Sequence, residues 1–197
     1  MKKCLSLLAV ASVVFSLVGC SDQKYNHISS INNLKQIGVA LAMYANDNGE
    51  KFPAPVARGK NKRPDAVAGL DVLIYNGYLE DLEVYVSRYD SMGKAAVDAG
   101  SFDPVENCSY AYLGRGAVAG VVSADFPLAI EKPWRLPSVN KVIAVLFADG
   151  SVRSVEIPNA NRKSCREIAE ILITRGSLQE KEKKLLRENA ALADELR

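Results

Sequence analysis

The chain has 197 residues, and 48% of them are hydrophobic, which suffices for one domain with a core plus an appendage. Its formal net charge is +2, and two of the lysines, Lys2 and Lys3, belong to a segment that we expect to be removed. The remaining chain is then neutral, which gives no electrostatic reason to expect nucleic-acid binding.

The N-terminus has the layout of a secretory signal peptide. A basic start precedes an uncharged stretch over residues 5–18, and small residues lead to Cys20. Residues 17–20 (Leu-Val-Gly-Cys) resemble a bacterial lipobox, in which the cysteine is lipidated and the chain is cut before it. We therefore expect residues 1–19 to be a lipoprotein signal peptide. An ordinary signal peptide and an uncleaved anchor are the alternatives, although the run is shorter than the roughly 20 residues that span a bilayer.

Lipid on Cys20 would make the chain an exported protein anchored in the cell envelope. One acyl chain holds a protein only marginally, whereas the several chains of a lipoprotein cysteine hold it stably. Ser21 rather than aspartate follows the cysteine. By analogy with envelope sorting, this favours the outer membrane, on the side that faces the periplasm.

Residues 20–27 are interpreted as a short polar tether that leads into a helix. Asn46 to Gly49 supply the stop signal of this helix, and the Pro- and Gly-rich stretch that follows, with its basic segment Lys60–Asp65, is predicted to be a solvated loop. Residues 70–86 are predicted to form a short helix, a turn and an extended piece. The helix is indicated by six apolar residues at spacings of three and four, which share one face: Ile28, Ile31, Leu34, Ile37, Leu41 and Tyr44.

Short strands are predicted from Cys108 onward. Residues 109–113 alternate in polarity, and residues 117–122 are small and β-branched. The clearest element is a hairpin of two apolar runs on either side of Asp149 and Gly150. Asp-Gly between such runs favours a type I′ turn, which needs positive φ at both central residues.

The C-terminal residues 161–197 are predicted to be helical. Ser164 to Glu167 and Ser177 to Glu180 each fit a capping box at a helix start, and Gly176 between them suits a helix end. Two consecutive helices or one kinked helix are therefore expected. A short coiled-coil seam that could dock on a partner, or else a solvated amphipathic tail, is indicated by Leu178, Leu185, Asn189, Leu192 and Leu196.

Several short motifs follow one another between residues 28 and 157: residues 33–41 (Asn-Leu-Lys-Gln-Ile-Gly-Val-Ala-Leu), Tyr44, Asn48-Gly49, Phe52-Pro53, Gly77-Tyr78-Leu79, Val84-Tyr85-Val86, residues 108–112 (Cys-Ser-Tyr-Ala-Tyr), Pro127-Leu128-Ala129 and residues 145–152. Their order resembles the bacterial pseudopilin-like proteins related to the type II secretion major pseudopilin. The resemblance implies a helix packed on a small antiparallel sheet and a structural role near a secretion or pilus-like machine.

The chain also departs from this family pattern. Family members begin with a prepilin peptidase site and a hydrophobic helix that anchors and assembles the fibre, whereas a lipobox signal stands here. One large group ends in a His-x9-Asp-Gly motif, whose histidine would fall at Val139. The cysteine that often follows the strand near Val86 is Ser87 here, which leaves Cys108 without its usual partner.

The residue types that commonly carry catalysis are few. His27 lies in the expected tether with no base or nucleophile beside it in sequence. With Cys20 lipidated, only Cys108 and Cys165 could form a disulfide in an oxidising envelope. Cys165 stands at a predicted helix start, which lowers a thiol pKa, so a thiol-dependent enzyme is the least favoured alternative. Turn chemistry alone explains Asp149.

Calcium is a weaker expectation, and no other cofactor is expected. Secretion pseudopilins resembling this chain can carry the ion in a C-terminal loop of carboxylates and carbonyls. Solvated loop acids are the default interpretation, because the spacing of the candidate ligands fits no defined motif. The candidates lie in stretches that look like loops: Asp98, Asp103, Glu106 and Asp125.

The fold class expected is α+β, with a pilin-like N-terminal helix packed on a small antiparallel sheet over residues 28–160 and a helical extension over residues 161–197. The function expected is that of a non-catalytic, lipid-anchored, pseudopilin-like envelope protein with a structural or interaction role. The alternative is an envelope lipoprotein, unrelated to secretion, that binds a ligand or partner through Lys60–Asp65 and the tail.

Overall fold

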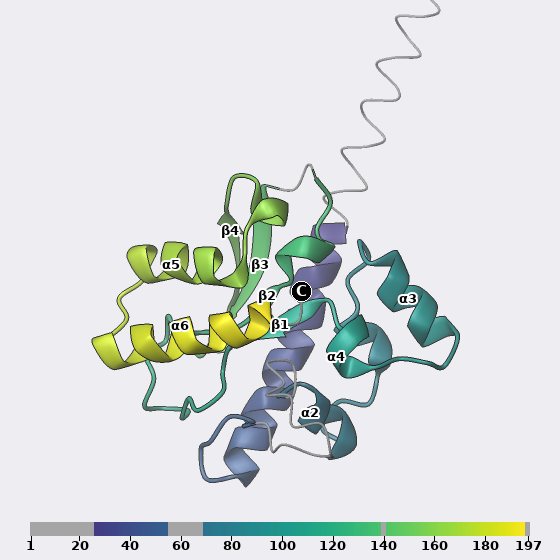
Figure 1. Ribbon diagram of the computed structural model, residues 1–197. Coiled ribbons are helices and arrows are strands. Elements are labelled where there is room, and N and C mark those ends of the chain that lie inside the picture. Colours follow the sequence, from purple (N-terminus) through teal and green to yellow (C-terminus); the bar gives the residue numbers. More distant parts are fainter. Residues whose placement is uncertain (1–25, 55–68, 139–140, 196–197) are drawn as a thin grey trace, which may run out of the picture.

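The computed structural model describes residues 26–54, 69–138 and 141–195 (Figure 1). The mixed α+β class expected from the sequence is confirmed: a helix at the start of the described chain, one antiparallel sheet and a pair of C-terminal helices. Several expectations lie outside the described residues: the signal peptide, Cys20 and most of the tether, the segment Lys60–Asp65, and Val139.

The α-helices lie before and after the strands in the chain, and one 3-10 helix lies between β2 and β3. The described part of the N-terminal helix covers residues 26–47. The others are α2 (Asp71–Tyr75), η1 (Leu82–Tyr85), α3 (Ser91–Asp98), α4 (Pro104–Asn107), β1 (Tyr110–Tyr112), β2 (Pro127–Glu131), η2 (Pro133–Arg135), β3 (Val142–Phe147), β4 (Val152–Glu156), η3 (Ala160–Arg162), α5 (Cys165–Arg175) and α6 (Glu180–Asp194).

The four strands lie in the order β1-β2-β3-β4, and every neighbouring pair is antiparallel. Tyr110 pairs with Glu131, and Val142 pairs with Glu156. The register shifts between Pro127 and Ala129, where a proline that cannot donate to the ladder opens β2. All residues of β1 and β2 are buried, whereas β4 is an exposed edge. Successive side chains of a strand point to opposite faces, so the full burial of β1 and β2 means that both faces of the sheet are covered at these strands.

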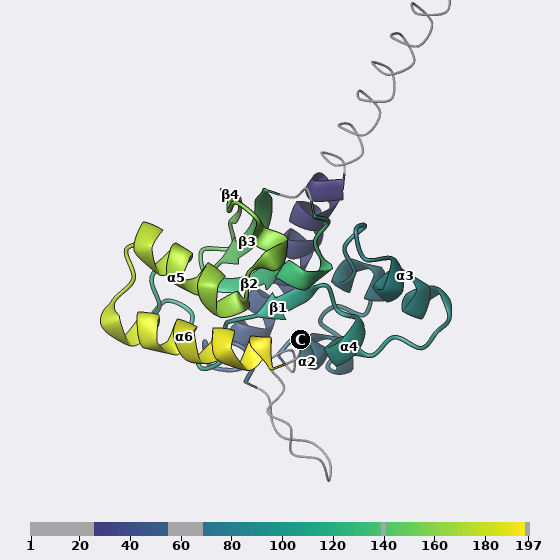
Figure 2. The ribbon, with the colours of Figure 1, turned by 45° about the horizontal axis from the view of Figure 1, so that its top comes forward.

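The N-terminal helix covers one face of the sheet, and α5 and α6 lie on the other side (Figures 1 and 2). The apolar stripe predicted from the spacing is buried at its centre, where Leu34, Ile37 and Leu41 are fully buried, whereas Ile28 at the start of the helix is 44% exposed. Gly38 lets the helix approach closely, because a Cβ at this position would lie 2.8 Å from Leu146 Cδ1 of β3. Burial of such side chains contributes roughly 1.5–3 kcal/mol each and dominates the stability of this contact.

The expected boundary between tether and helix is corrected by two residues. Asn26 and His27 are already helical, and His27 Nε2 is hydrogen-bonded to Ser154 Oγ of β4 at 2.8 Å. The residue interpreted as part of a polar tether is therefore half-buried and connects the start of the helix to the edge strand.

The strand predicted over residues 117–122 is wrong. Val118 forms an isolated bridge with Lys51, its neighbours Ala117 and Ala119 hydrogen-bond to Phe52 and Glu50, and turns surround this contact. Gly116 and Gly120 have φ of +75° and +71°, a left-handed backbone that interrupts an extended run. The β-branched composition of this stretch was therefore outweighed by its glycines.

The hairpin of β3 and β4 is confirmed, but its turn is not type I′. Gly150 N–H donates to Phe147 O at 3.0 Å, and Phe147 N–H donates to Ser151 O at 2.9 Å, so three residues form the loop. Gly150 has a φ of +78°, whereas Asp149 is not among the residues with positive φ. This is the three-residue loop with glycine in the left-handed position. Asp149 Oδ1 instead accepts from the amide and hydroxyl of Ser151.

The segment between α2 and β1 is more helical than expected. Residues 82–85 form the 3-10 helix η1 rather than an extended piece, and Asp81 caps it by accepting from Glu83 N–H. Helices α3 and α4 were not foreseen, although each starts with an aspartate cap, Asp90 or Asp103. An aspartate N-cap is a recognised start signal, so the signal was present in the sequence.

The two consecutive C-terminal helices are confirmed, and so is the capping box of Ser164 and Glu167. The second predicted box is wrong by two residues: Gln179 and Glu182 form it, rather than Ser177 and Glu180. Gly176 does end α5, but with a φ of −99°. The start of α6 is therefore fixed by the side chains of Gln179 and Glu182, which bind backbone amides at the beginning of the helix.

Helix α6 packs on its own domain rather than presenting a seam. Its buried face consists of Glu182, Leu186, Asn189, Ala190 and Ala193. This face belongs to the same hydrophobic core as the sheet, with Leu185 and Leu192 packed against it. Neither the coiled-coil seam nor the solvated tail describes this helix.

Asn189 provides a test of this packing. Its Nδ2 donates to Leu113 O at 2.7 Å and to Arg115 O at 2.9 Å from a position only 3% exposed. Asn189→Ala leaves two carbonyls without these donors, and we expect the free energy of unfolding to fall by about 2 kcal/mol in urea denaturation of the full chain. Glu188→Ala, on the exposed face of the same helix, should change it by less than about 0.5 kcal/mol. Equal effects would mean that α6 is not part of the cooperative unit.

Candidate functional site

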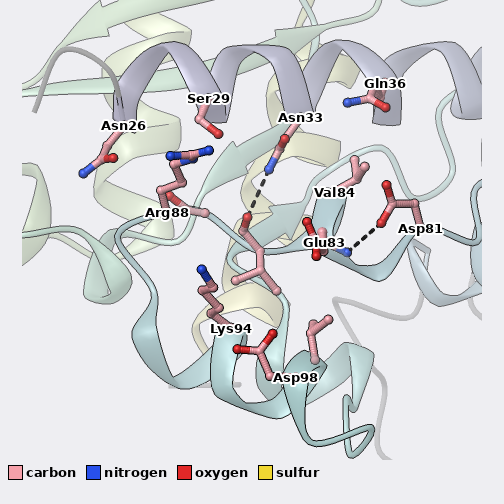
Figure 3. A pocket seen from close by; sticks show the side chains of 13 residues that line it. Asn26, Ser29, Asn33, Gln36, Asp81, Glu83, Val84, Arg88, Lys94 and Asp98 are labelled. Carbon is pink, nitrogen blue, oxygen red and sulfur yellow. Dashed lines mark hydrogen bonds between the residues drawn. The ribbon is translucent and has the colours of Figure 1, made fainter. Parts of the chain in front are cut away.

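A polar cleft of about 500 Å³ lies between the N-terminal helix and the segment of residues 81–98. The helix forms one wall, and η1, the loop after it and α3 form the other (Figure 3). Three valines and ten polar residues line it: Asn26, Ser29, Asn33, Gln36, Asp81, Glu83, Val84, Val86, Ser87, Arg88, Lys94, Val97 and Asp98.

The helical wall of the cleft is a row of four uncharged polar side chains. Asn26, Ser29, Asn33 and Gln36 recur at spacings of three and four, so they lie along one side of the helix next to its buried stripe. Ten residues separate the first from the last, which corresponds to about 15 Å along the helix axis. The row therefore presents hydrogen-bond donors and acceptors at intervals of about one helical turn.

The opposite wall of the cleft carries charges of both signs. Arg88 lies below Asn26 and Ser29, with Lys94 beyond it, whereas Glu83 and Asp81 lie toward Gln36 (Figure 3). Asp98 lies beside Lys94, so carboxylates lie toward both ends of the row.

The floor of the cleft is held in place by hydrogen bonds. Asn33 Nδ2 donates to Val86 O at 3.0 Å, and the hydroxyls of Ser30 and Ser87 are 3.0 Å apart. Ser87 N–H donates to Ser109 Oγ at 2.9 Å. Ser30, Ser87 and Ser109 are all at most 3% exposed. The wall after η1 is therefore fixed both to the N-terminal helix and to the start of β1.

Below the floor, Asp90 connects three parts of the fold from a position 4% exposed. It accepts from Gly93 N–H at the start of α3, from Ser109 Oγ at 2.9 Å and from Arg135 Nη1 at 3.1 Å. Charge-assisted bonds of this kind are about twice as strong as neutral ones. Asp90 therefore fixes the position of the charged wall of the cleft relative to the sheet.

Two cations of the segment after β2 hold the end of α4. Lys132 Nζ donates to Val105 O at 3.2 Å, and Arg135 Nη2 donates to Glu106 O at 2.6 Å. Positive charge at a helix C-terminus is favourable, and here it satisfies carbonyls that the short helix leaves open. Lys132 is only 2% exposed, and burial lowers the pKa of its ammonium.

Glu131 is a buried carboxyl on the strand beside these cations. It is 1% exposed, and its Oε2 accepts from Ala144 N–H of β3 at 2.7 Å. Burial raises the pKa of Glu131 to about 7, although interactions with Ser30 and Ala144 act in the opposite direction. Its charge state therefore changes near neutral pH.

The two candidate disulfide cysteines, Cys108 and Cys165, do not form a disulfide in the structure, and both are fully buried. Burial raises the pKa of Cys108, and the nearby Lys132 partly offsets this. Cys165 does begin α5, as predicted, but its N–H donates to Asp194 Oδ1 of α6 and its side chain is 0% exposed. The thiol considered for catalysis is thus closed off from solvent.

The acids considered for calcium are not brought together, and only Asp103 and Asp125 lie outside helices and strands, as expected for loop residues. Asp98 ends α3, Glu106 lies in α4, and Asp103 caps α4 by accepting from two of its amides. Asp125 forms an ion pair with Arg153 at 2.7 Å. Among the residues that the structure describes, no three acidic, histidine or cysteine side chains gather closely enough to hold a metal ion.

The remaining candidate residues, His27 and Asp149, contact side chains of the hairpin. Burial lowers the pKa of His27, which contacts Ser154 rather than a nucleophile and base pair. Asp149 pairs with Arg153 at 2.9 Å, and the guanidinium lies 4.3 Å from the centroid of the Phe147 ring. The cleft itself was missed from the sequence, although the polar row beside the apolar stripe of the helix was a usable signal.

Comparisons with known proteins add no relative: no family model, no curated protein and no solved structure matches the chain. The resemblance to pseudopilin-like proteins therefore stays a prediction. Within the described ranges, no helix combines the length and the apolar character needed to cross a membrane.

Glu131 predicts a pH dependence of stability. Because its pKa is raised from 4.5 to about 7 in the folded chain, its stabilising effect is present below pH 4.5 and is lost as the pH rises toward 7. We expect Glu131→Gln to become more stable relative to wild type between pH 4.5 and pH 8, by on the order of 3 kcal/mol in urea denaturation. A pH-independent difference between the two proteins would contradict this, and Glu188→Gln on exposed α6 is the matched control.

Proposed function

We propose that the chain is a non-catalytic, lipid-anchored, pseudopilin-like protein of the cell envelope. Its role is structural or one of interaction, beside a type II secretion or pilus-like machine. Lipid on Cys20 places it in the outer membrane, facing the periplasm. The proposal combines the lipobox, the ordered motifs between residues 28 and 157 and the arrangement of helix and sheet.

One observation carries the proposal: the amphipathic N-terminal helix lies across an antiparallel sheet. This is the arrangement that the family resemblance implies, and the motif of residues 33–41 supplies its buried side chains Leu34, Ile37 and Leu41. The Gly38 of the same motif allows the close approach to Leu146. The motif thus has a physical reason for its composition, which supports the resemblance.

The lipid would take the place of the hydrophobic helix that anchors family members and assembles their fibre. Five residues, 21–25, separate Cys20 from Asn26, the first described residue of the helix. The domain would then be held beside the membrane through its N-terminal helix, as in the family, but by acyl chains instead of a spanning segment.

The C-terminal helices are less suited to the partner docking considered for them. Their apolar residues, Ile168 and Leu186 among them, are buried in the common core. A partner would have to bind the outer, charged face of α6, where Lys184 and Glu188 are exposed. The ligand route through Lys60–Asp65 lies outside the described residues.

The lipid anchor is tested with Cys20→Ser. Expressed in a bacterium with a working lipoprotein pathway, the wild type should gain the mass of the acyl chains and sediment with membranes, because several chains hold a protein stably. The variant should lack the added mass and remain in the soluble or precursor fraction. Intact mass spectrometry and membrane fractionation measure both properties.

Cys4→Ser is the matched control, since it removes the other cysteine of the N-terminal segment and should leave the acyl mass unchanged. An unmodified, soluble wild type would contradict the lipoprotein proposal and indicate a freely secreted domain.

A further inference from the structure

We propose that the helix start (residues 26–33) is a proton-sensitive element. It stays packed on the sheet while the carboxyl of Glu131 is neutral, and it detaches when that carboxyl is ionised. Asn26, Ser29 and Asn33 of the cleft wall belong to the helix start, so its detachment would also remove one wall of the cleft. This goes beyond the proposed function, because it concerns a conformational change and does not require the lipid anchor.

The helix start is held mainly by hydrogen bonds, unlike the rest of the helix. Ile28 is 44% exposed, and Ile31 is only partly buried against the core, whereas buried apolar side chains follow from Leu34 onward. A segment with few buried apolar contacts opens at a lower free energy than the core. Three polar contacts attach the helix start to the rest of the fold: His27 to Ser154, Ser30 to Ser87, and Asn33 to Val86.

A buried acid whose hydrogen bonds are incomplete lies under the helix start. Glu131 pairs with Tyr110 across β2 and β1, which places their side chains next to each other on one face of the sheet. They are 1% and 0% exposed. Among the residues that the structure describes, neither Glu131 Oε1 nor Tyr110 OH has a hydrogen-bond partner. Ser30 lies close enough to lower the pKa of both side chains, so the helix start covers this pair.

A charge on Glu131 is costly in this position. Its Oε2 accepts from Ala144 N–H at 2.7 Å, but a buried carboxylate also loses the water around its other oxygen. Burial therefore raises the pKa of Glu131 from 4.5 to about 7. Detachment of the helix start would admit water to the carboxylate. Ionisation and detachment consequently favour each other.

The titratable side chains that act on Glu131 from the neighbouring elements are uncharged near neutral pH. Tyr110 on β1 has a raised pKa, and burial raises the pKa of Tyr89, in the segment before α3, to about 12. Three charged side chains interact with one another: Lys132, Arg135 and Asp90. The pKa of Glu131 follows burial, opposed by Ser30 and Ala144, rather than these charges.

His27 is the titratable side chain of the helix start itself. Burial lowers its pKa below 6.5, so its charge appears only in more acidic solution and destabilises the packed state there. This effect has the opposite direction to that of Glu131. A variant of Glu131 that keeps His27 therefore separates the two contributions.

The test is amide hydrogen exchange of the full chain, purified in detergent and followed by NMR. The amides of residues 30–33 bond to the carbonyls of residues 26–29, so their protection factors report the opening of the helix start. Between pH 6 and pH 8 we expect these factors to fall about tenfold, the effect of a carboxyl whose pKa is 4.5 when exposed and about 7 when covered. They should be lower than those of β3 and change little at low urea concentrations, because a small opening exposes little surface.

Two variants assign the effect to the carboxyl. Glu131→Gln keeps the size of the side chain but cannot ionise, so the tenfold fall should disappear and leave only the opposite trend of His27. Glu188→Gln, on the exposed face of α6, is the matched control and should retain the fall. Cys20→Ser should also retain it, so failure of the lipid-anchor proposal leaves this test unaffected.

Three results would overturn the proposal. The protection of residues 30–33 stays constant between pH 6 and pH 8 in the wild type, it falls equally in Glu131→Gln, or it matches that of β3 in size and in urea dependence. The last result would mean that Glu131 reaches water only by global unfolding. The first and the last need no variant, so the test holds even if Glu131→Gln does not fold.

Discussion

The contact between the N-terminal helix and the sheet is the interaction on which the rest of the structure depends. Leu34, Ile37 and Leu41 are removed from water only because the helix lies flat on the strands, and Gly38 allows it to approach β3 closely. Once this face is buried, the polar row from Asn26 to Gln36 must lie beside it, at the boundary with the segment of residues 81–98. The cleft is therefore a consequence of how the helix packs.

Regular patterns in the sequence were sufficient to predict the elements whose stability is local or strongly amphipathic. The helix of residues 26–47, the β3–β4 hairpin and the capping box at Ser164 follow from periodicity, turn residues and caps. The seam proposed for α6 failed because heptad spacing does not distinguish a partner helix from the chain's own sheet. Asn189 shows this, since the carbonyls that it binds, Leu113 O and Arg115 O, are more than 70 positions away in sequence.

The site was harder to predict than the fold, because its parts come together only in the tertiary structure. Asn33 and Val86 are 53 positions apart, and Asp90 and Arg135 are 45 apart. A polar residue in a helix usually indicates a solvated face, and nothing in the sequence showed that another segment lies across the row. Several candidates chosen by residue type turned out to have structural partners: Cys165 N–H donates to Asp194, Asp103 caps α4, and Asp125 pairs with Arg153.

The short connection at the start of the helix has a geometric consequence. The six steps along the chain from Cys20 to Asn26 reach at most about 22 Å when fully extended, and Asn26 lines the cleft. With acyl chains on Cys20, this end of the cleft would stay within that distance of the bilayer surface. The domain would then sample a thin layer of the periplasm rather than its full depth, and a partner displayed at the membrane would meet it at a higher effective concentration than one in free solution.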